Sequence, residues 1–250
     1  MSIRKTALIT GASAGIGAAS ARLLAANGYD VAIAYHSDKA GAEAVAAEAR
    51  ASGAHAVLLQ ADVGDPAQIE RMFTELAAEF PRLDAVVNNA GIVAATARVE
   101  DMDAARLQRM FAVNVIGAFL VARAAVRAMS TRFGGQGGAI VNMSSVAALL
   151  ASPNQYVDYA ASKAAIDTLT KGLATEVAAD GIRVNAIRPG LIDTELHAKG
   201  GEPGRAQRLA HLVPMQRTGS ADEVAQAVLW LLSDAASYVT GTHLDVSGGR

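Results

Sequence analysis

The sequence predicts an α/β fold: a single doubly wound domain of the Rossmann type, built on a mostly parallel sheet of seven strands. Short apolar runs of β type alternate with longer Ala-rich segments of helical period, as in a parallel sheet covered by helices on both faces. A glycine-rich turn joins the first run to the first helical segment, and polar residues follow later runs. Because the 250 residues are 52% apolar and contain no visible linker, we expect one domain over residues 1–250.

The elements follow one another in this alternating order. Strands are expected at Ala7–Thr10, Val31–Tyr35, Ala56–Ala61, Ala85–Asn88, Ala139–Met143, Arg183–Ile187 and His243–Val246. Helices are expected at Ile16–Asn27, Ala40–Ala51, Pro66–Glu79, Ala104–Ser130, Val157–Ala179 and Ala221–Leu232. Pro66 after Asp65 marks a helix start, because a proline in the first turn gives up an N–H group that would have no partner.

The stretch Leu191–Met215 breaks this alternation, because three glycines and a proline interrupt any long helix between residues 200 and 204. We expect a substrate-loop insertion near residues 191–215 that acts as a mobile lid over a site. An ordinary surface loop is the alternative.

Charge and composition exclude several classes of partner. The formal net charge of −2, with acids and bases interspersed, gives no footprint for nucleic acid or an anionic membrane surface. The absence of cysteine excludes disulfides and thiol chemistry, and the five histidines lack the spacing of a metal motif. No stretch approaches the ~20 apolar residues of a membrane span, and the N-terminal residues show no signal-peptide core. We therefore expect no metal site and a cytoplasmic location.

The turn after the first strand reads Thr10-Gly11-Ala12-Ser13-Ala14-Gly15-Ile16-Gly17. Glycines permit a tight turn and let backbone N–H groups approach a pyrophosphate at the positive end of a helix. The spacing is Gly-x3-Gly-x-Gly and differs from the general dinucleotide pattern G-x-G-x-x-G. A glycine-rich turn without a ligand is the alternative.

Polar residues also follow neighbouring strands. Asp62 closes the third strand, and Asn88-Asn89-Ala90-Gly91 closes the fourth. Ligands of open parallel sheets bind at the carboxyl edge, where these residues are expected. Helix capping by Asp62 and turn formation by the asparagines are the alternatives.

Tyr159 and Lys163 lie four residues apart in a segment of helical period, so both project from one helix face. A phenol has a pKa of ~10, and shifting it to near neutrality requires roughly 4 kcal/mol, part of which a neighbouring ammonium supplies. The strand Ala139–Met143 delivers Ser144 and Ser145 to the same side of the sheet, where a hydroxyl can hydrogen-bond a substrate oxygen. A second Tyr-x3-Lys pair, Tyr35 and Lys39, lacks an upstream serine.

With these residues in place, the chain resembles a short-chain dehydrogenase/reductase along nearly its whole length. The family's motifs occur in order: TGASAGIG at 10–17, NNAG at 88–91, Asn114, Ser145, YAASK at 159–163 and PG at 189–190. The resemblance implies that Tyr159 is the acid/base and that Lys163 lowers its pKa and holds the nicotinamide ribose. It also implies that Ser145 positions the substrate and that Asn114 supports a water relay to Lys163.

The patterns and the resemblance together imply one set of cofactor-binding residues. They are Gly11, Ser13, Ala14, Gly15, Ile16, Gly17, Tyr35, His36, Ser37, Asp62, Val63, Asn89, Ala90, Gly91, Tyr159, Lys163, Pro189, Gly190, Ile192 and Thr194.

Two departures from the family pattern matter. The Ser145–Tyr159 separation is one residue longer than usual, which predicts a small insertion around Ser152–Asp158 and leaves Ser144 as a minor alternative. Position 14 is alanine, where many NADP-using relatives place a basic residue. The second strand nevertheless ends without an acid, so we expect NADP(H) to be preferred over NAD(H), which stays possible.

The expected activity is hydride transfer between a nicotinamide cofactor and a small carbonyl or secondary alcohol. A catalytically weak dinucleotide-binding sensor or scaffold, and an epimerase or dehydratase on the same fold, are the alternatives. The sequence does not identify the substrate: Arg205 or His197 could meet an anion, but exposed, solvated charges are the favoured explanation. The resemblance also implies a homotetramer formed by the Ala104–Ser130 and Val157–Ala179 helices and the C-terminal region.

Overall fold

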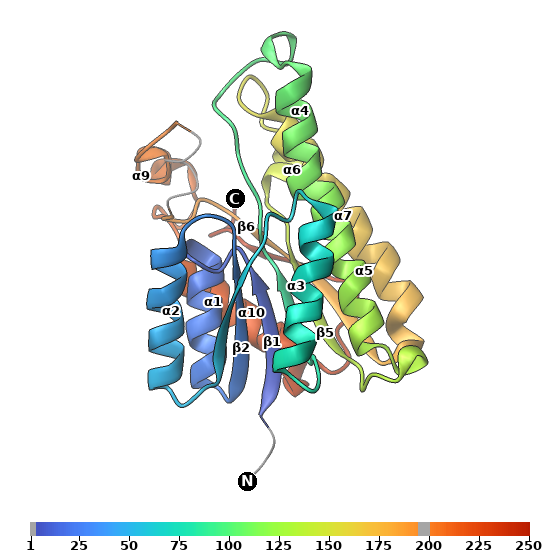
Figure 1. Ribbon diagram of the computed structural model, residues 1–250. Helices are drawn as coiled ribbons and strands as arrows, with labels where there is room; N and C mark the ends of the chain where they lie inside the picture. Colours follow the sequence, from blue (N-terminus) through green and yellow to red (C-terminus); the bar gives the residue numbers. More distant parts are fainter. Residues whose placement is uncertain (1–3, 195–200) are drawn as a thin grey trace.

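The computed structural model describes residues 4–194 and 201–250, which form three layers with a seven-stranded sheet in the middle (Figure 1). The strand order is β3-β2-β1-β4-β5-β6-β7, and every pairing between neighbours is parallel. The strands are β1 Lys5–Thr10, β2 Tyr29–Tyr35, β3 Ala56–Gln60, β4 Ala85–Asn88, β5 Gly138–Met143, β6 Ile182–Pro189 and β7 His243–Val246. The predicted single Rossmann-type domain is confirmed, with a sheet that is parallel throughout.

Helices cover both faces of the sheet because successive strand residues point to opposite sides. In β1, Leu8 and Ile9 are both fully buried but belong to two separate apolar clusters, one on each face. One face packs against α1 (Gly15–Ala26), α2 (Lys39–Ala51) and α10 (Ala221–Leu232). The other packs against α3 (Pro66–Glu79), α5 (Ala118–Met129) and α7 (Val157–Val177). The sheet is therefore buried on both sides, as its near-continuous apolar strands require.

Several helices begin where the sequence provides a cap. Asp65 accepts a hydrogen bond from the backbone N–H of Ala67 at 3.0 Å, and Pro66 occupies the first turn of α3, as predicted. Ser220 and Glu223 form a reciprocal capping box at the start of α10. These local signals explain why the observed bounds of α3 and α10 match the predicted ones.

The predicted helix Ala104–Ser130 consists of three pieces: α4 (Ala104–Phe111), a π-helical segment (Ala112–Gly117) and α5. Contrary to the sequence-based expectation, the continuous helix Ala104–Met129 is long and apolar enough to cross a bilayer by length and composition. In the fold its Val121, Ala125 and Met129 side chains are fully buried against the sheet. Packing within the domain therefore explains part of its apolar character.

Two short helices were not predicted: α6 (Ala147–Leu150) and α9 (Arg205–Arg208). Each is a single turn, too short for a periodic pattern to reveal. Three non-glycine residues with positive φ, Ala151, Ser152 and Asn154, lie in the loop between α6 and α7. The loop that was expected to contain the extra residue is therefore where the backbone adopts unusual conformations.

Candidate active site

A cavity of about 640 Å³ opens at the carboxyl edge of the sheet, the upper edge in Figure 1. Residues that follow the ends of β1 to β6 line it, and the short helices α6 and α9 contribute to its wall. This position matches the general location of ligand sites in open parallel sheets. All predicted site residues except Gly17 and Asn114 line this cavity.

The glycine-rich turn forms one wall of the cavity. Gly15 begins α1 with a φ of +56°, and the N-cap residue Ala14 provides no side-chain cap, so the first N–H groups of α1 lack a side-chain acceptor. A Cβ at Gly17 would lie 2.4 Å from the carbonyl oxygen of Gly11, so the close packing of the helix against the turn requires glycine at this position. Asn89 holds the same turn by donating to the carbonyl oxygen of Thr10 at 2.8 Å. The turn is thus shaped to accept an anion at a helix N-terminus.

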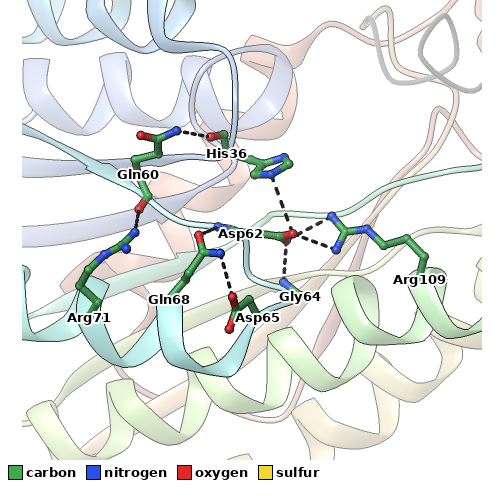
Figure 2. A network of polar contacts seen from close by, with 8 residues as sticks. All are labelled: His36, Gln60, Asp62, Gly64, Asp65, Gln68, Arg71 and Arg109. Carbon is green, nitrogen blue, oxygen red and sulfur yellow. Dashed lines mark hydrogen bonds and ion pairs between the residues drawn. The ribbon is translucent and has the colours of Figure 1, made fainter.

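At the ends of β2 and β3, the carboxylate of Asp62 is the centre of a polar network (Figure 2). It accepts two hydrogen bonds from Arg109 at 2.9 and 3.2 Å and one from the backbone N–H of Gly64 at 2.8 Å. His36 Nε2 lies 3.8 Å away. Burial tends to raise the pKa of Asp62, but the hydrogen bonds and charge of Arg109 outweigh it and lower the pKa. Sequence reasoning found Asp62 and His36 but missed Arg109.

Tyr159 and Lys163 are both buried on α7 and face the cavity. Lys163 Nζ lies 5.6 Å from the centroid of the Tyr159 ring and donates to the carbonyl oxygen of Met143, the last residue of β5, at 2.8 Å. Burial raises the pKa of Tyr159 to about 12, against a hydrogen bond from Ser145 that lowers it. Burial also lowers the pKa of Lys163 to about 8. Without a ligand, the phenol of Tyr159 is therefore protonated at neutral pH, and the amine of Lys163 is still mostly protonated.

The structure distinguishes the two serines after β5. Ser144 is buried, and its hydroxyl donates to the backbone carbonyl of Lys163 at 3.1 Å. Ser145 is half-buried at the cavity, where its hydroxyl accepts from the backbone N–H of Ala147 at 3.1 Å. The Ser145 hydroxyl also interacts with the Tyr159 phenol, so Ser145 is the better candidate.

Asn114 lies in the π-helical segment and is buried. Its Oδ1 accepts from the backbone N–H of Ile92 at 2.8 Å, and its Nδ2 donates to the Ile92 carbonyl at 2.9 Å. Lys163 Nζ and Asn114 Oδ1 both approach Gly91, where an added Cβ would lie 3.3 and 3.4 Å from them. Asn114 thus fixes the loop beside Lys163, without lining the cavity itself.

The far end of the cavity contains Arg205, which the sequence offered as a disfavoured contact for an anion, together with residues that the sequence did not indicate. Arg205 is 7% exposed, so the expectation that it is a solvated surface charge is wrong. The guanidinium lies 5.2 Å from the centroid of the Tyr156 ring, and that ring lies 5.8 Å from the Tyr159 ring. His197 lies outside the described residues. The other unpredicted lining residues with polar side chains are Asp38, Arg109, Ser152, Gln155 and Arg250.

Part of the predicted substrate loop is also placed. Ile192 pairs with Gly219 in an isolated parallel bridge, and both Leu191 and Ile192 are buried. After the undescribed residues 195–200, α9 brings Arg205 to the cavity. Among the described residues, no cluster of three or more His, Asp or Glu side chains is arranged to hold a metal ion.

Comparison with known proteins gives consistent matches over the whole chain. A family model described as Enoyl-(Acyl carrier protein) reductase matches residues 11–250. The Escherichia coli (strain K12) protein named Uncharacterized oxidoreductase YgfF is 54% identical over 244 residues, which cover 98% of this chain and 99% of that protein. A solved short-chain dehydrogenase from Burkholderia cenocepacia J2315 in complex with NADP has a TM-score of 0.90 at 35% identity, covering 98% of this chain and 97% of that one. A 3-ketoacyl-(acyl-carrier-protein) reductase from Brucella melitensis, complexed with NADH, has a TM-score of 0.90 at 35% identity, covering 98% of each chain.

Proposed function

The chain belongs to the short-chain dehydrogenase/reductase family of oxidoreductases, and from this premise we propose that it interconverts a carbonyl and a secondary alcohol with a nicotinamide cofactor. One observation supports this most strongly. Tyr159, Lys163 and Ser145 lie together in the same cavity that the glycine-rich turn before α1 lines. A cofactor with a pyrophosphate and a reactive ring needs both features in one cavity.

The residues present fit such a cofactor. The N-cap of α1 makes no side-chain hydrogen bond and Gly15 has a positive φ, so the start of this helix can accept a pyrophosphate. Asp62 and Val63 would contact the adenine end of the cofactor. Ile192 and Thr194 line the cavity and would contact the nicotinamide end. When bound, the nicotinamide supplies or accepts the hydride.

Tyr159, Ser145 and Lys163 have separate roles in the proton transfer. In the reduction direction Tyr159 gives its phenolic proton to the carbonyl oxygen, and in oxidation it takes the proton back. Ser145 donates a hydrogen bond to the same oxygen, which orients it and stabilises developing negative charge. The ammonium of Lys163 lowers the free energy of the phenolate that forms, and its short bond to Met143 fixes its position.

The proposal includes a modest preference for NADP(H) over NAD(H). The end of β2 has no acid, and His36 and Ser37 are exposed at the cavity, where they can meet a 2′-phosphate. Asp38 is occupied at the N-cap of α2, where it accepts from Gly41 at 3.0 Å. Asp62 lies near His36, but the two bonds from Arg109 offset its charge.

The segment near residues 191–215 is proposed to close over the substrate.

The enzyme is proposed to be a cytoplasmic homotetramer. Exposed Ile116 and Phe119 on the outer side of the helix Ala104–Met129 support an interface there, since single domains rarely expose neighbouring large apolar side chains. Light scattering of the purified protein measures the subunit number. A monomer at micromolar concentration would refute this part of the proposal.

The experiment on function monitors the absorbance of NADPH or NADH in the presence of purified protein and a panel of ketones, diketones and quinones. Net oxidation with formation of the alcohol product is expected. An epimerase or dehydratase would convert its substrate without a net change in the nicotinamide, and a sensor would bind the cofactor without turnover. Either of these results would replace the proposed function.

A further inference from the structure

Arg205 is a buried cation in the wall of the cavity, beyond the predicted catalytic residues. Its Nη1 donates to Glu202 at 2.9 Å and its Nη2 donates to the side-chain oxygen of Gln155 at 2.5 Å. The guanidinium also packs on the Tyr156 ring. Because the side chain is 7% exposed, water does little to solvate its charge.

The hydrogen bonding of Arg205 is incomplete. The buried Nε of its guanidinium has no hydrogen-bond partner within the described part of the chain. A guanidinium has five N–H donors, and a buried donor without an acceptor costs free energy. The described residues therefore leave one donor of this cavity-lining guanidinium unused.

Cationic side chains gather at this end of the cavity. Of the described residues that line the cavity, the only acids are Asp38 and Asp62, at the ends of β2 and β3. The opposite end is lined by Lys163, Arg205 and Arg250. Burial raises the pKa of the Tyr156 hydroxyl. The charge of Arg205 lowers that pKa, the charge of Glu202 raises it and the charge of Arg250 lowers it, so two cations and one carboxylate act on this ring.

The carboxylate that pairs with Arg205 lies outside the cavity lining. Glu202 Oε2 accepts from Arg205 at 2.9 Å and from Arg208 at 3.1 Å, so one carboxylate is shared between two guanidinium groups. The hydroxyl of Thr96 also bonds Glu202 and is the main cause of its lowered pKa. Arg208 is exposed and its charge is screened by water, whereas Arg205 lines the cavity and Glu202 does not.

We propose that this end of the cavity binds a carboxylate on the substrate, with Arg205 as its principal donor, so that the enzyme acts on keto acids and their hydroxy acids. The inference rests on the proposed function and names its substrate class. A carboxylate accepts several N–H bonds at once and matches the planar guanidinium.

The distance between the Arg205 guanidinium and the Tyr159 side chain restricts the substrate further. The Tyr156 ring contacts both the Arg205 guanidinium and the Tyr159 ring, with separations of 5.2 and 5.8 Å. The width of one aromatic ring thus separates the cation from the acid/base residue. The carboxylate is then several bonds away from the reacting carbon, and 2-oxo acids, which join the two groups directly, fit poorly.

The test compares kcat/KM for 5-oxohexanoate, its methyl ester and 2-oxobutanoate in the wild type, Arg205→Met and Arg208→Met. We expect the wild type to favour 5-oxohexanoate over both other compounds. Arg205→Met should lower kcat/KM for 5-oxohexanoate about 10- to 100-fold but change kcat/KM for the methyl ester less than about threefold. Only the acid loses a charge-assisted hydrogen bond to the guanidinium. Arg208→Met is the matched control: it removes the other guanidinium on Glu202, lies outside the cavity lining, and should leave the preference unchanged.

Binding gives a second readout that does not depend on turnover. Calorimetry with hexanoate, which has the carboxylate but no carbonyl, should detect binding to the wild type and to Arg208→Met, and at least about tenfold weaker binding to Arg205→Met. Equal use of acid and ester by the wild type, or an equal loss for both in Arg205→Met, would overturn the carboxylate site while leaving the reductase intact. No reduction of any of the three compounds or of neutral ketones, together with unchanged hexanoate binding, would instead refute the proposed function.

Discussion

The guanidinium of Arg106 donates two hydrogen bonds to the carboxylate of Asp158, at 2.8 and 3.2 Å, one residue before Tyr159. The Asp158 side chain is fully buried, and Arg106 also donates to the backbone carbonyl of Ala95 at 2.6 Å. This ion pair connects α4 with the first turn of α7. It therefore fixes the position at which the phenol of Tyr159 enters the cavity.

Arg106→Met should destabilise the protein by about 3 kcal/mol, because it leaves a buried carboxylate without its partner. Urea unfolding of the wild type and the variant measures this free energy. Lys39→Gln is the control, since it removes an exposed pair with Glu43 and should cost less than about 1 kcal/mol. Equal and small losses in both variants would contradict a structural role for the Arg106–Asp158 pair.

Tyr159→Phe should keep the fold and cofactor binding but lower kcat roughly 10²- to 10⁴-fold, because it deletes only the hydroxyl that exchanges the proton. Turnover and the cofactor-induced shift in Tm check the two parts. Tyr238→Phe, at a fully exposed tyrosine, should leave kcat unchanged. A Tyr159→Phe variant with more than about a tenth of wild-type kcat would show that another group transfers the proton.

The stability of the ligand-free protein should rise with pH between about 8 and 10.5, because of Lys163. Burial lowers its pKa from 10.5 to about 8, so in this window the unfolded chain still binds a proton that the folded chain has released. The contribution of this residue to the free energy of unfolding should increase by about 3 kcal/mol across the window.

Urea unfolding at several pH values compares this rise between the wild type and two variants. Lys163→Met should lack it, whereas Lys39→Met, at an exposed lysine, should retain it. Parallel curves for the wild type and Lys163→Met would mean that Lys163 titrates normally in the folded state.

The ratio of kcat/KM for NADPH over NADH, measured with one substrate, should exceed one and should rise below about pH 6, where a histidine becomes positively charged. His36→Gln should remove the rise because its side chain cannot gain that charge. A clear preference for NADH would reverse the assignment. A ratio that is independent of pH would exclude His36 from the recognition of the 2′-phosphate.

Amide hydrogen exchange in residues 201–212 should slow when cofactor and substrate are added together, because this stretch includes α9 and is proposed to close over the substrate. Exchange in β1 and β5, at the centre of the sheet, is the internal reference. The same exchange with and without ligands would identify the segment as rigid scaffold.

The parts of the molecule that depend on local pattern could be predicted from the sequence. The predicted bounds of α3 and β4 match the structure, because a cap, a proline or a short apolar run defines them within a few residues. Tyr159 and Lys163 were found in the same way, since helical spacing alone places them on one face. The order of the strands then places Ser145 near them.

The parts of the molecule that depend on contacts between residues far apart in the sequence could not be predicted. The burial of Arg205 is set by Gln155 and Tyr156, about fifty positions earlier in the chain, and nothing in the neighbouring glycines and proline indicates it. The ion pair between Asp62 and Arg109 joins β3 to α4 in a similar way. Such pairs need three-dimensional proximity, which periodicity and propensity do not encode.

The π-helical segment Ala112–Gly117 accommodates one extra residue per turn within an otherwise α-helical rod. If the same residues formed a regular α-helix instead, the two halves would be turned relative to each other by about 100°. Arg106 could then reach Asp158 only if Val121, Ala125 and Met129 rotated out of the core. The irregularity is therefore a phase correction between two surfaces of one helix: it lets Arg106 face Asp158 while Val121, Ala125 and Met129 face the sheet.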